Sequence, residues 1–211
     1  MGKDIILRIL GELGVEGARY KALEITGNSL KYLNIDDRIS ISNMAIECGA
    51  KNCIFNYDET TKQFIKNRIN REYKFFESDE DALYFKTIEI DCSELEPQIA
   101  LPSSPDNVKS VHESKGIKIN QVYIGSCTNG RISDLSKTAK ILKGKKISKD
   151  VRLFITPGSQ DVYLEALREG LIEIFIKAGA FVNGPSCGAC FGGHFGVIGD
   201  NEVCLSTTNR N

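Results

Sequence analysis

Residues 121–144 read QVYIGSCTNGRISDLSKTAKILKG, and this stretch decides the class of fold. The apolar run QVYIGS stops at Cys127, and apolar residues then recur at helical spacing between Ile132 and Leu142. The pattern predicts a strand, a tight turn that holds Cys127, and a helix. Alternating strands and helices of this kind are typical of an α/β fold with a largely parallel sheet.

The same alternation continues on both sides of this stretch. Helices are expected at residues 4–13, 36–50, 59–69, 160–170 and 171–179, and strands at residues 21–26, 52–56, 84–91, 151–156 and 202–208. The polar stretch 94–109 contains Pro97, Pro102 and Pro105 and is typical of a linker. The sequence therefore predicts two α/β domains, residues 1–106 and 107–211, each with a largely parallel sheet covered by helices.

A second glycine-rich motif, NGPSCGACFGG, spans residues 183–193 and contains Cys187 and Cys190. Together with Cys127 it offers three thiolates, one fewer than a tetrahedral zinc site needs. Three thiolates suit an iron–sulfur cluster with one iron left open as a Lewis acid, and the chemistry that this favours is dehydration. Two alternatives remain open: Cys187 and Cys190 as a redox dithiol, and Cys127 as a small buried side chain.

Composition and charge limit the classes of function. The 211 residues are 41% hydrophobic, which is enough for a core, and 27 basic against 28 acidic residues leave no surplus for a nucleic-acid surface. There is no apolar run long enough to span a membrane and no signal-peptide pattern. Seven cysteines, an odd number, indicate a reducing, cytoplasmic compartment, and those outside the two motifs are expected in the core: Cys48, Cys53, Cys92 and Cys204.

Four motifs resemble those of the aconitase superfamily, in the same order along the chain. They are NMAIECGAK (43–51), GSCTNGR (125–131), GPSCGACFGG (184–193) and STTNRN (206–211). Within the superfamily, DETTKQFIKNR (58–68) is most similar to the large subunits of 3-isopropylmalate dehydratase and homoaconitase. The resemblance implies two aconitase-type three-layer α/β units. Because those large subunits are longer, we also expect this chain to lack an N-terminal α/β domain and a C-terminal segment.

The resemblance implies a cofactor and its ligands. Cys127, Cys187 and Cys190 would bind one 4Fe-4S cluster, whose fourth iron stays open to the substrate. Asn129 and Arg131 adjoin the first of these cysteines and are candidates for supporting hydrogen bonds.

The resemblance also implies roles for residues outside the cysteine motifs. Asn43 would donate to a cluster sulfur and Glu47 would hydrogen bond to the substrate hydroxyl, and their spacing puts both on one face of a predicted helix. Without the resemblance, Glu47 would be interpreted as a solvated carboxylate. Asn209 would lie beside the cluster, and Arg210 would clamp a substrate carboxylate. His194 matches no catalytic position and is expected to be structural.

The function that the resemblance implies is that of an iron–sulfur hydro-lyase in leucine biosynthesis. It would isomerise a 2-alkylmalate, such as 3-isopropylmalate or citramalate, by dehydration and rehydration. The base would be a serine of a separate small subunit, in a heterodimer or heterotetramer, so the chain alone is expected to be inactive. A homoaconitase large subunit is the alternative within the family. An electron-transfer protein and a non-catalytic binding module are the alternatives outside it.

Overall fold

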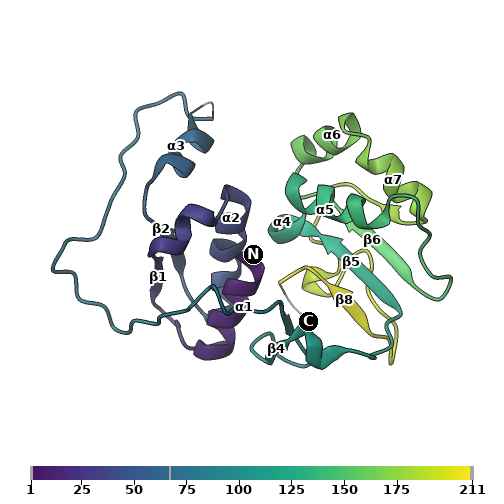
Figure 1. Cartoon of the computed structure of the whole chain (residues 1–211), viewed down its shortest axis with the longest axis horizontal. Coiled ribbons are helices and arrows are strands. Elements are labelled where there is room, and N and C mark those ends of the chain that lie inside the picture. Colours follow the sequence, from purple (N-terminus) through teal and green to yellow (C-terminus); the bar gives the residue numbers. More distant parts are fainter. Residues whose placement is uncertain (1, 67, 210–211) are drawn as a thin grey trace. The chain divides into compact units, whose positions relative to one another are not determined.

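The computed structural model describes residues 2–66 and 68–209 and separates into two compact units, residues 1–99 and 100–211 (Figure 1). The division falls inside the proline-bearing stretch 94–109. A two-stranded sheet of β3 (Gln98–Ala100) and β4 (Val108–Ser110) lies in the same part of the chain, which the sequence pattern did not predict. Within the described residues, no helix has the length and apolar character needed to cross a membrane.

The first unit is an α/β unit built on a parallel pair of strands. Its elements are α1 (Gly2–Leu13), β1 (Ala22–Ile25), the 3-10 helix η1 (Asn28–Tyr32), α2 (Ile35–Met44), the 3-10 helix η2 (Ala45–Cys48), β2 (Asn52–Phe55) and α3 (Glu59–Ile65). β1 and β2 pair in parallel, with Leu23 opposite Cys53. The apolar face of α1 packs on α2, where Ile6, Leu10 and Ile41 are fully buried.

One ion pair between a buried arginine and a partly exposed aspartate joins α2 to the start of α3. The Arg38 side chain is 3% exposed, and its two terminal nitrogens donate to both carboxylate oxygens of Asp58 at 2.7 and 2.6 Å. Asp58 is also the N-cap of α3 and accepts the backbone N–H of Thr61. Further bonds from Arg38 go to the backbone oxygens of Leu30 and Leu33. Every donor group of this buried cation therefore has an acceptor.

Replacing Asp58 by alanine should destabilise the first unit substantially. The change leaves the Arg38 cation buried without its anion and also removes a helix cap, so we expect a loss of about 3 kcal/mol in the free energy of unfolding. Urea unfolding followed by circular dichroism measures this loss. Glu59→Ala is the matched control, because Glu59 pairs with Lys62 in solvent and its removal should cost less than about 1 kcal/mol. Equal losses in the two variants would contradict this account of the ion pair.

The same pair predicts a direction for the pH dependence of stability. Hydrogen bonds from Arg38 lower the pKa of Asp58 from 3.8 to about 2, so the folded state favours the ionised carboxylate. The stabilisation is complete above the ordinary pKa and is lost as the pH falls through about 4 toward 2. The difference in unfolding free energy between wild type and Asp58→Ala should therefore shrink over that range.

The second unit contains a four-stranded parallel sheet. Its main elements are β5 (Gln121–Gly125), α4 (Ser126–Asn129), α5 (Ile132–Leu142), β6 (Arg152–Thr156), α6 (Gln160–Arg168), α7 (Leu171–Ala178), β7 (Phe181–Val182), the 3-10 helix η4 (Gly188–Phe191) and β8 (Cys204–Ser206). A further 3-10 helix, η3 (Val111–Ser114), follows β4. The strand order is β7-β6-β5-β8, and every pairing is parallel. The predicted α/β class with parallel sheets and helices is confirmed.

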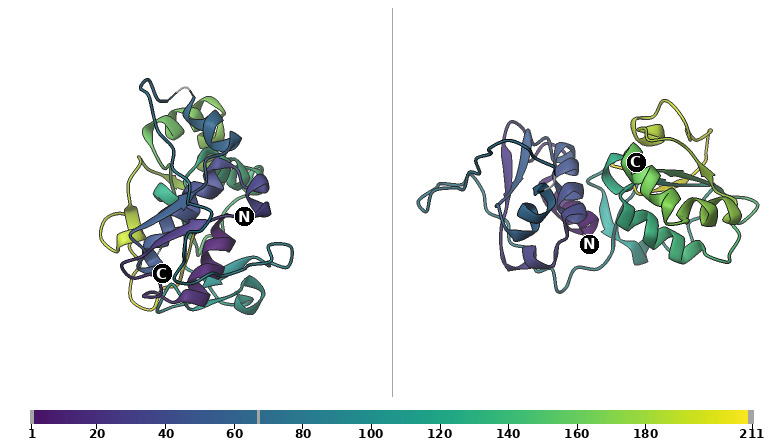
Figure 2. Two further views of the ribbon diagram at one scale, coloured as in Figure 1. Left: turned by 90° about the vertical axis from the view of Figure 1, so that its left-hand side faces the viewer. Right: turned by 90° about the horizontal axis from the view of Figure 1, so that it is seen from above.

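The two faces of this sheet are covered differently. Helices α5, α6 and α7 pack on one face, around a core that contains Leu135, Ile155 and Phe175. The other face carries Tyr123 and Phe154, which stack at 6.4 Å, and Phe195 meets Phe154 edge-on. Figure 2 (right) shows the helices on one side of the strands and the yellow C-terminal segment on the other. The segment that carries Cys187 and Cys190 therefore lies against the face that the helices leave open.

The chain changes direction across the sheet at β5. It passes from β5 through β6 to β7 on one side, and then returns to place β8 on the opposite side of β5. In open parallel sheets, ligands bind at the carboxyl ends of the strands where the strand order reverses. For this unit, that position is the end of β5 and β8, where Cys127 and Asn209 follow the strands.

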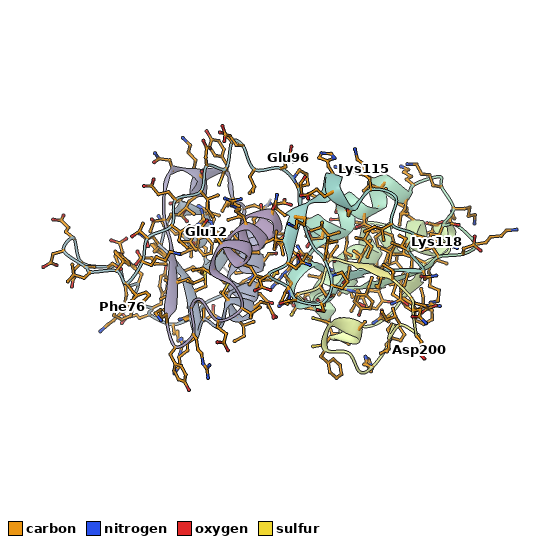
Figure 3. The ribbon with its side chains drawn as sticks, turned by 90° about the horizontal axis from the view of Figure 1, so that it is seen from below. Glu12, Phe76, Glu96, Lys115, Lys118 and Asp200 are labelled. Carbon is orange, nitrogen blue, oxygen red and sulfur yellow. The ribbon has the colours of Figure 1, made fainter. Side chains whose placement is uncertain are left out.

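One predicted strand is absent from the described structure. Residues 84–91 were expected to form a strand, but this segment has no ladder of backbone hydrogen bonds. It lies in a long irregular stretch that also contains Phe76, 81% exposed and labelled in Figure 3. The hydroxyls of Ser78 and Tyr84 donate to the carboxylate of Glu24 in β1. An alternating pattern becomes a strand only when a neighbouring backbone is available for pairing.

Candidate functional site

A strained turn presents Cys127 at the end of β5. Gly125 has φ +124°, and a Cβ at this position would lie 1.9 Å from the carbonyl oxygen of Thr156, so only glycine fits. Ser126 follows with φ 69°, a left-handed conformation that is uncommon for a non-glycine residue. Cys127 is exposed in the short helix α4 that begins there. The sequence motif thus forms the predicted strand-to-helix turn, and its cysteine faces solvent.

The Ser126 side chain next to Cys127 is buried and lacks a partner. Ser126 is 1% exposed, and its hydroxyl has no hydrogen bond within the part of the chain that the structure describes. A buried hydroxyl without a partner is costly, so such a group is expected to serve a bound group or water. This hydroxyl marks the Cys127 turn as a place where a bound group would complete the hydrogen bonding.

Asn209 lies beside the same turn. Its side-chain oxygen accepts a hydrogen bond from the Thr128 hydroxyl, and the backbone N–H of Gly125 donates to the Thr207 hydroxyl at 3.0 Å. The segment after β8 therefore runs along the Cys127 turn, as the parallel pairing of β5 with β8 requires. Arg210, the predicted carboxylate clamp, lies outside the described residues.

The loop that carries Cys187 and Cys190 rests on β5. Cys187 is exposed and Cys190 is half-buried, and the N–H of Cys190 donates to the carbonyl oxygen of Cys187 at 3.1 Å. Gly188 between them has φ +53°, and a Cβ there would lie 1.7 Å from the Tyr123 hydroxyl. The loop thus contacts the strand that ends at Cys127, although its own strand, β7, is two places away in the sheet.

The three cysteines have the side chains that a thiolate-bound cofactor needs, and all three belong to the second unit. None of the seven cysteines forms a disulfide, so these three remain thiols. In residues 2–66 and 68–209, however, no three Cys, His, Asp or Glu side chains are gathered as they would be around a metal ion. Convergence of Cys127, Cys187 and Cys190 on one cluster stays a prediction.

Two of the four remaining cysteines lie in the core as expected, and two do not. Cys48 and Cys53 are buried, and burial raises their pKa values to about 12 and about 11, which keeps both thiols protonated and unreactive. Cys92 and Cys204 are only half-buried, so they lie at the edge of the core and not within it. His194 is exposed and contacts the ring of Phe195.

Asn43 and Glu47 lie in the first unit, and the geometry expected for them needs correction. The α-helix ends at Met44, and Glu47 belongs to the 3-10 helix η2. Gly49 terminates this segment with φ 80°, and the tighter winding before it rotates Glu47 relative to Asn43. The two side chains therefore do not share one face of a continuous α-helix. Both are half-buried.

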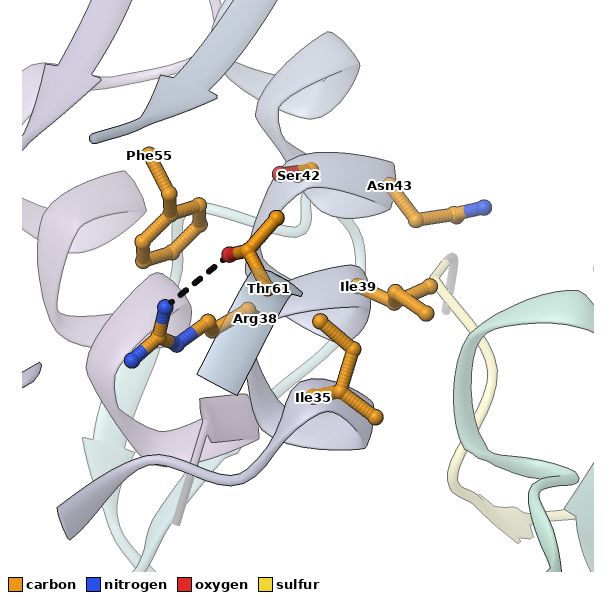
Figure 4. Close-up of a pocket in the computed structure, with 7 residues that line it drawn as sticks. All are labelled: Ile35, Arg38, Ile39, Ser42, Asn43, Phe55 and Thr61. Carbon is orange, nitrogen blue, oxygen red and sulfur yellow. Dashed lines mark hydrogen bonds between the residues drawn. The ribbon is translucent and has the colours of Figure 1, made fainter. Parts of the chain in front are cut away.

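Asn43 also lines a cavity of about 450 Å³ between α2, β2 and α3. Figure 4 shows Arg38 hydrogen bonded to Thr61 on one side, while Asn43 points away from this pair. Apolar side chains, Ile39 among them, form much of the remaining wall. Because Asp58 already neutralises Arg38, this cation is committed to the fold and is not a binding group.

Sequence reasoning missed a polar network beneath the cysteine loop. The hydroxyls of Tyr123 and Thr156 lie 2.7 Å apart, and Thr156 donates to the side-chain oxygen of Asn183 at 2.8 Å. Thr156 ends β6 and Asn183 follows β7, so both stand at the carboxyl ends of parallel strands. The sequence did offer one signal for this network. Thr156 ends a predicted strand and Asn183 begins the second glycine-rich motif, and in parallel sheets ligands bind at the carboxyl ends of the strands.

Comparison with known proteins gives a family match along the chain. The model of the Aconitase family (aconitate hydratase) matches residues 1–117 and 109–211. The 3-isopropylmalate dehydratase large subunit of Caldanaerobacter subterraneus subsp. tengcongensis is 56% identical over 210 residues, which cover 100% of this chain and 50% of that protein. The protein of the same name from Wolinella succinogenes is 54% identical over 214 residues, covering 100% of this chain and 51% of its own length. The chain spans about half the length of the curated relatives it matches.

Proposed function

Because this chain belongs to the aconitase family, we propose that it is part of the large subunit of an iron–sulfur hydro-lyase that isomerises 3-isopropylmalate. The observation that carries the proposal is the placement of two cysteine motifs at one sheet, with Gly188 of the second motif against Tyr123 of the strand that ends in the first. The names of the relatives support the substrate: they are 3-isopropylmalate dehydratase large subunits.

Cys127, Cys187 and Cys190 are the proposed ligands of a 4Fe-4S cluster. Three ligands leave one iron open, and when bound the cluster supplies a Lewis acid that polarises the C–O bond of the substrate hydroxyl. Cys127 and Cys187 are exposed, so both can be reached for assembly. The Ser126 hydroxyl, buried beside Cys127, is available to donate to a bound group.

The other proposed site residues position the substrate and handle a proton. Glu47 hydrogen bonds to the substrate hydroxyl and supplies the proton with which it leaves as water, and Asn43 donates a supporting hydrogen bond. Asn209 orients the substrate from beside the Cys127 turn, where Thr128 holds its side chain. Arg210 pairs with a substrate carboxylate through two parallel N–H bonds.

The reaction also needs a base for the proton on the neighbouring carbon. We assign it to a serine of a small-subunit partner, as the resemblance implies. The relatives are named as large subunits, which supports the existence of such a partner. Water then returns at the adjacent carbon, which completes the isomerisation. A heterodimer or heterotetramer in the cytoplasm would carry out the reaction, consistent with seven cysteines that form no disulfide.

The test is reconstitution of the intact large subunit with its small subunit under anaerobic conditions. Absorbance of the unsaturated intermediate, a diacid from 3-isopropylmalate and citramalate and a triacid from homocitrate, measures turnover on the three substrates in turn. We expect turnover on 3-isopropylmalate to exceed that on the others at least tenfold. Preference for homocitrate would favour the homoaconitase alternative. A cluster whose electron paramagnetic resonance signal ignores every substrate would favour electron transfer and overturn the proposal.

A further inference from the structure

The cysteine loop rests on one fully buried phenol, that of Tyr123. Tyr123 lies in the centre of β5, is 0% exposed, and sits on the sheet face that the helices leave open. The loop fits its ring at both ends: a Cβ on Gly188 would lie 1.7 Å from its hydroxyl, and one on Gly196 would lie 3.0 Å from its ring carbons. Neither position leaves space for a side chain, so the loop is shaped around this ring.

The Tyr123 hydroxyl lies between the cysteine loop and β6. On the loop side it faces Gly188, where an added Cβ would lie 1.7 Å from it. It lies 2.7 Å from the Thr156 hydroxyl, whose own proton goes to the side-chain oxygen of Asn183. Thr156 has one proton to give, so Tyr123 must be the donor of the bond between the two hydroxyls. Burial raises the pKa of Tyr123, which keeps this donor protonated.

Hydrogen bonds lead from the Tyr123 hydroxyl, under Gly188, back into the same loop. The path runs from Tyr123 through Thr156 to Asn183. The Asn183 amide then donates to the carbonyl oxygen of Gly184 at 2.9 Å and toward the Ser186 hydroxyl at 3.4 Å. The loop is thus in contact with Tyr123 at Gly188 and is hydrogen bonded to Asn183 at Gly184 and Ser186. Because the bond between Tyr123 and Thr156 is buried, removing one of these hydroxyls leaves the other without its partner.

We propose that Tyr123 is a positioning residue that holds the Cys187–Cys190 loop in the conformation in which its thiols bind a cluster. That the loop binds a cluster rests on the proposed function. The hydrogen bonds that hold the loop do not depend on any cofactor. Tyr123 acts through the loop and has no contact with the reacting atoms. Its hydroxyl sets how closely Gly188 approaches β5, and therefore where the neighbouring Cys187 and Cys190 lie.

The decisive variant is Tyr123→Phe, compared with Tyr163→Phe. Tyr163 belongs to α6, packs on the core of the same unit, and donates no hydrogen bond to the cysteine loop. In cluster-free protein, alkylation of each cysteine by iodoacetamide is followed by mass spectrometry. We expect Tyr123→Phe to accelerate alkylation of the half-buried Cys190 about tenfold, the factor that corresponds to one lost buried hydrogen bond. Alkylation of Cys127, on the other loop, should stay within twofold in both variants.

A second variant and a second measurement keep the outcome decisive. Thr156→Val breaks the same path while keeping the Tyr123 ring, and it should reproduce the change at Cys190. After anaerobic reconstitution, the cluster of Tyr123→Phe should decay about tenfold faster in air than that of Tyr163→Phe, as read from its visible absorbance. Wild-type alkylation rates at Cys190 in both path variants would overturn the proposal. If wild type takes up no cluster, the proposed function fails, whereas the alkylation result still decides the role of Tyr123.

Discussion

A large subunit in which Cys187 is replaced by alanine should take up no stable cluster and should show no turnover with its small subunit. Only two of the three proposed thiolate ligands would remain, and two cannot hold a 4Fe-4S cluster against loss to water. Cys127→Ala and Cys190→Ala should behave in the same way, because each removes one ligand of a set that has no spare. The measurements are iron and sulfide per chain, visible absorbance, and formation of the unsaturated diacid.

Cys92→Ala and Cys204→Ala are matched controls for these variants. Both cysteines are half-buried like Cys190, and neither lies in a glycine-rich motif. Iron content and turnover should stay near wild type in both. Loss of cluster in a control and retention in Cys187→Ala would reassign the ligands. Retention in all three ligand variants would refute the cluster site altogether.

The alternation of strands and helices in the second unit was predictable because each element carries its own local signal. The strand–turn–helix at Cys127 follows from an apolar run, a glycine and a helical repeat, and β6, α6, α7 and β8 have similar patterns. β7 was missed because it has only two residues, Phe181–Val182. It exists because β6 offers an edge for pairing, which no local pattern reports.

The sequence allowed the candidate site residues to be predicted, but not the contacts between them. Glycines at 125 and 188 indicated tight backbone turns, and the structure shows what each avoids: the Thr156 carbonyl in one case and the Tyr123 hydroxyl in the other. These contacts depend on the register between β5 and β6, which places Tyr123 opposite Phe154 and Gly125 opposite Thr156. Register is a long-range property, so the path through Tyr123, Thr156 and Asn183 had no counterpart in any single motif.

Around Asn43 and Glu47, a small change in helical winding changes which residues share one face of the helix. An α-helix through residue 50 would have placed the two side chains one above the other, about 40° apart around the axis. The structure instead tightens to a 3-10 helix from Ala45 to Cys48, ahead of the left-handed Gly49. In a 3-10 helix, with three residues per turn, two residues four positions apart are separated by about 120° around the helix axis. The expectation that Asn43 and Glu47 share one face of a continuous α-helix therefore fails where the winding changes.

Replacing Glu47 by glutamine in the intact large subunit should preserve the cluster and abolish most turnover. Glutamine keeps the length and shape of the side chain and can still hydrogen bond, but it cannot give or take the proton of the leaving hydroxyl. We expect kcat to fall at least about 100-fold, with little change in KM, because the lost interaction acts in the transition state.

Glu12→Gln is the matched control for this change, because Glu12 lies exposed on α1, as labelled in Figure 3, and should leave kcat unchanged. Iron content and visible absorbance must match wild type in both variants, since neither change touches a ligand. If Glu47→Gln and Glu12→Gln contain equal iron but differ in turnover, Glu47 acts in proton transfer and not in cluster binding. Cysteine variants cannot make this distinction, because they lose the cluster and the activity together. Full turnover by Glu47→Gln would show that this half-buried carboxylate takes no part in the chemistry, and the proton would then have to come from another group at the substrate hydroxyl.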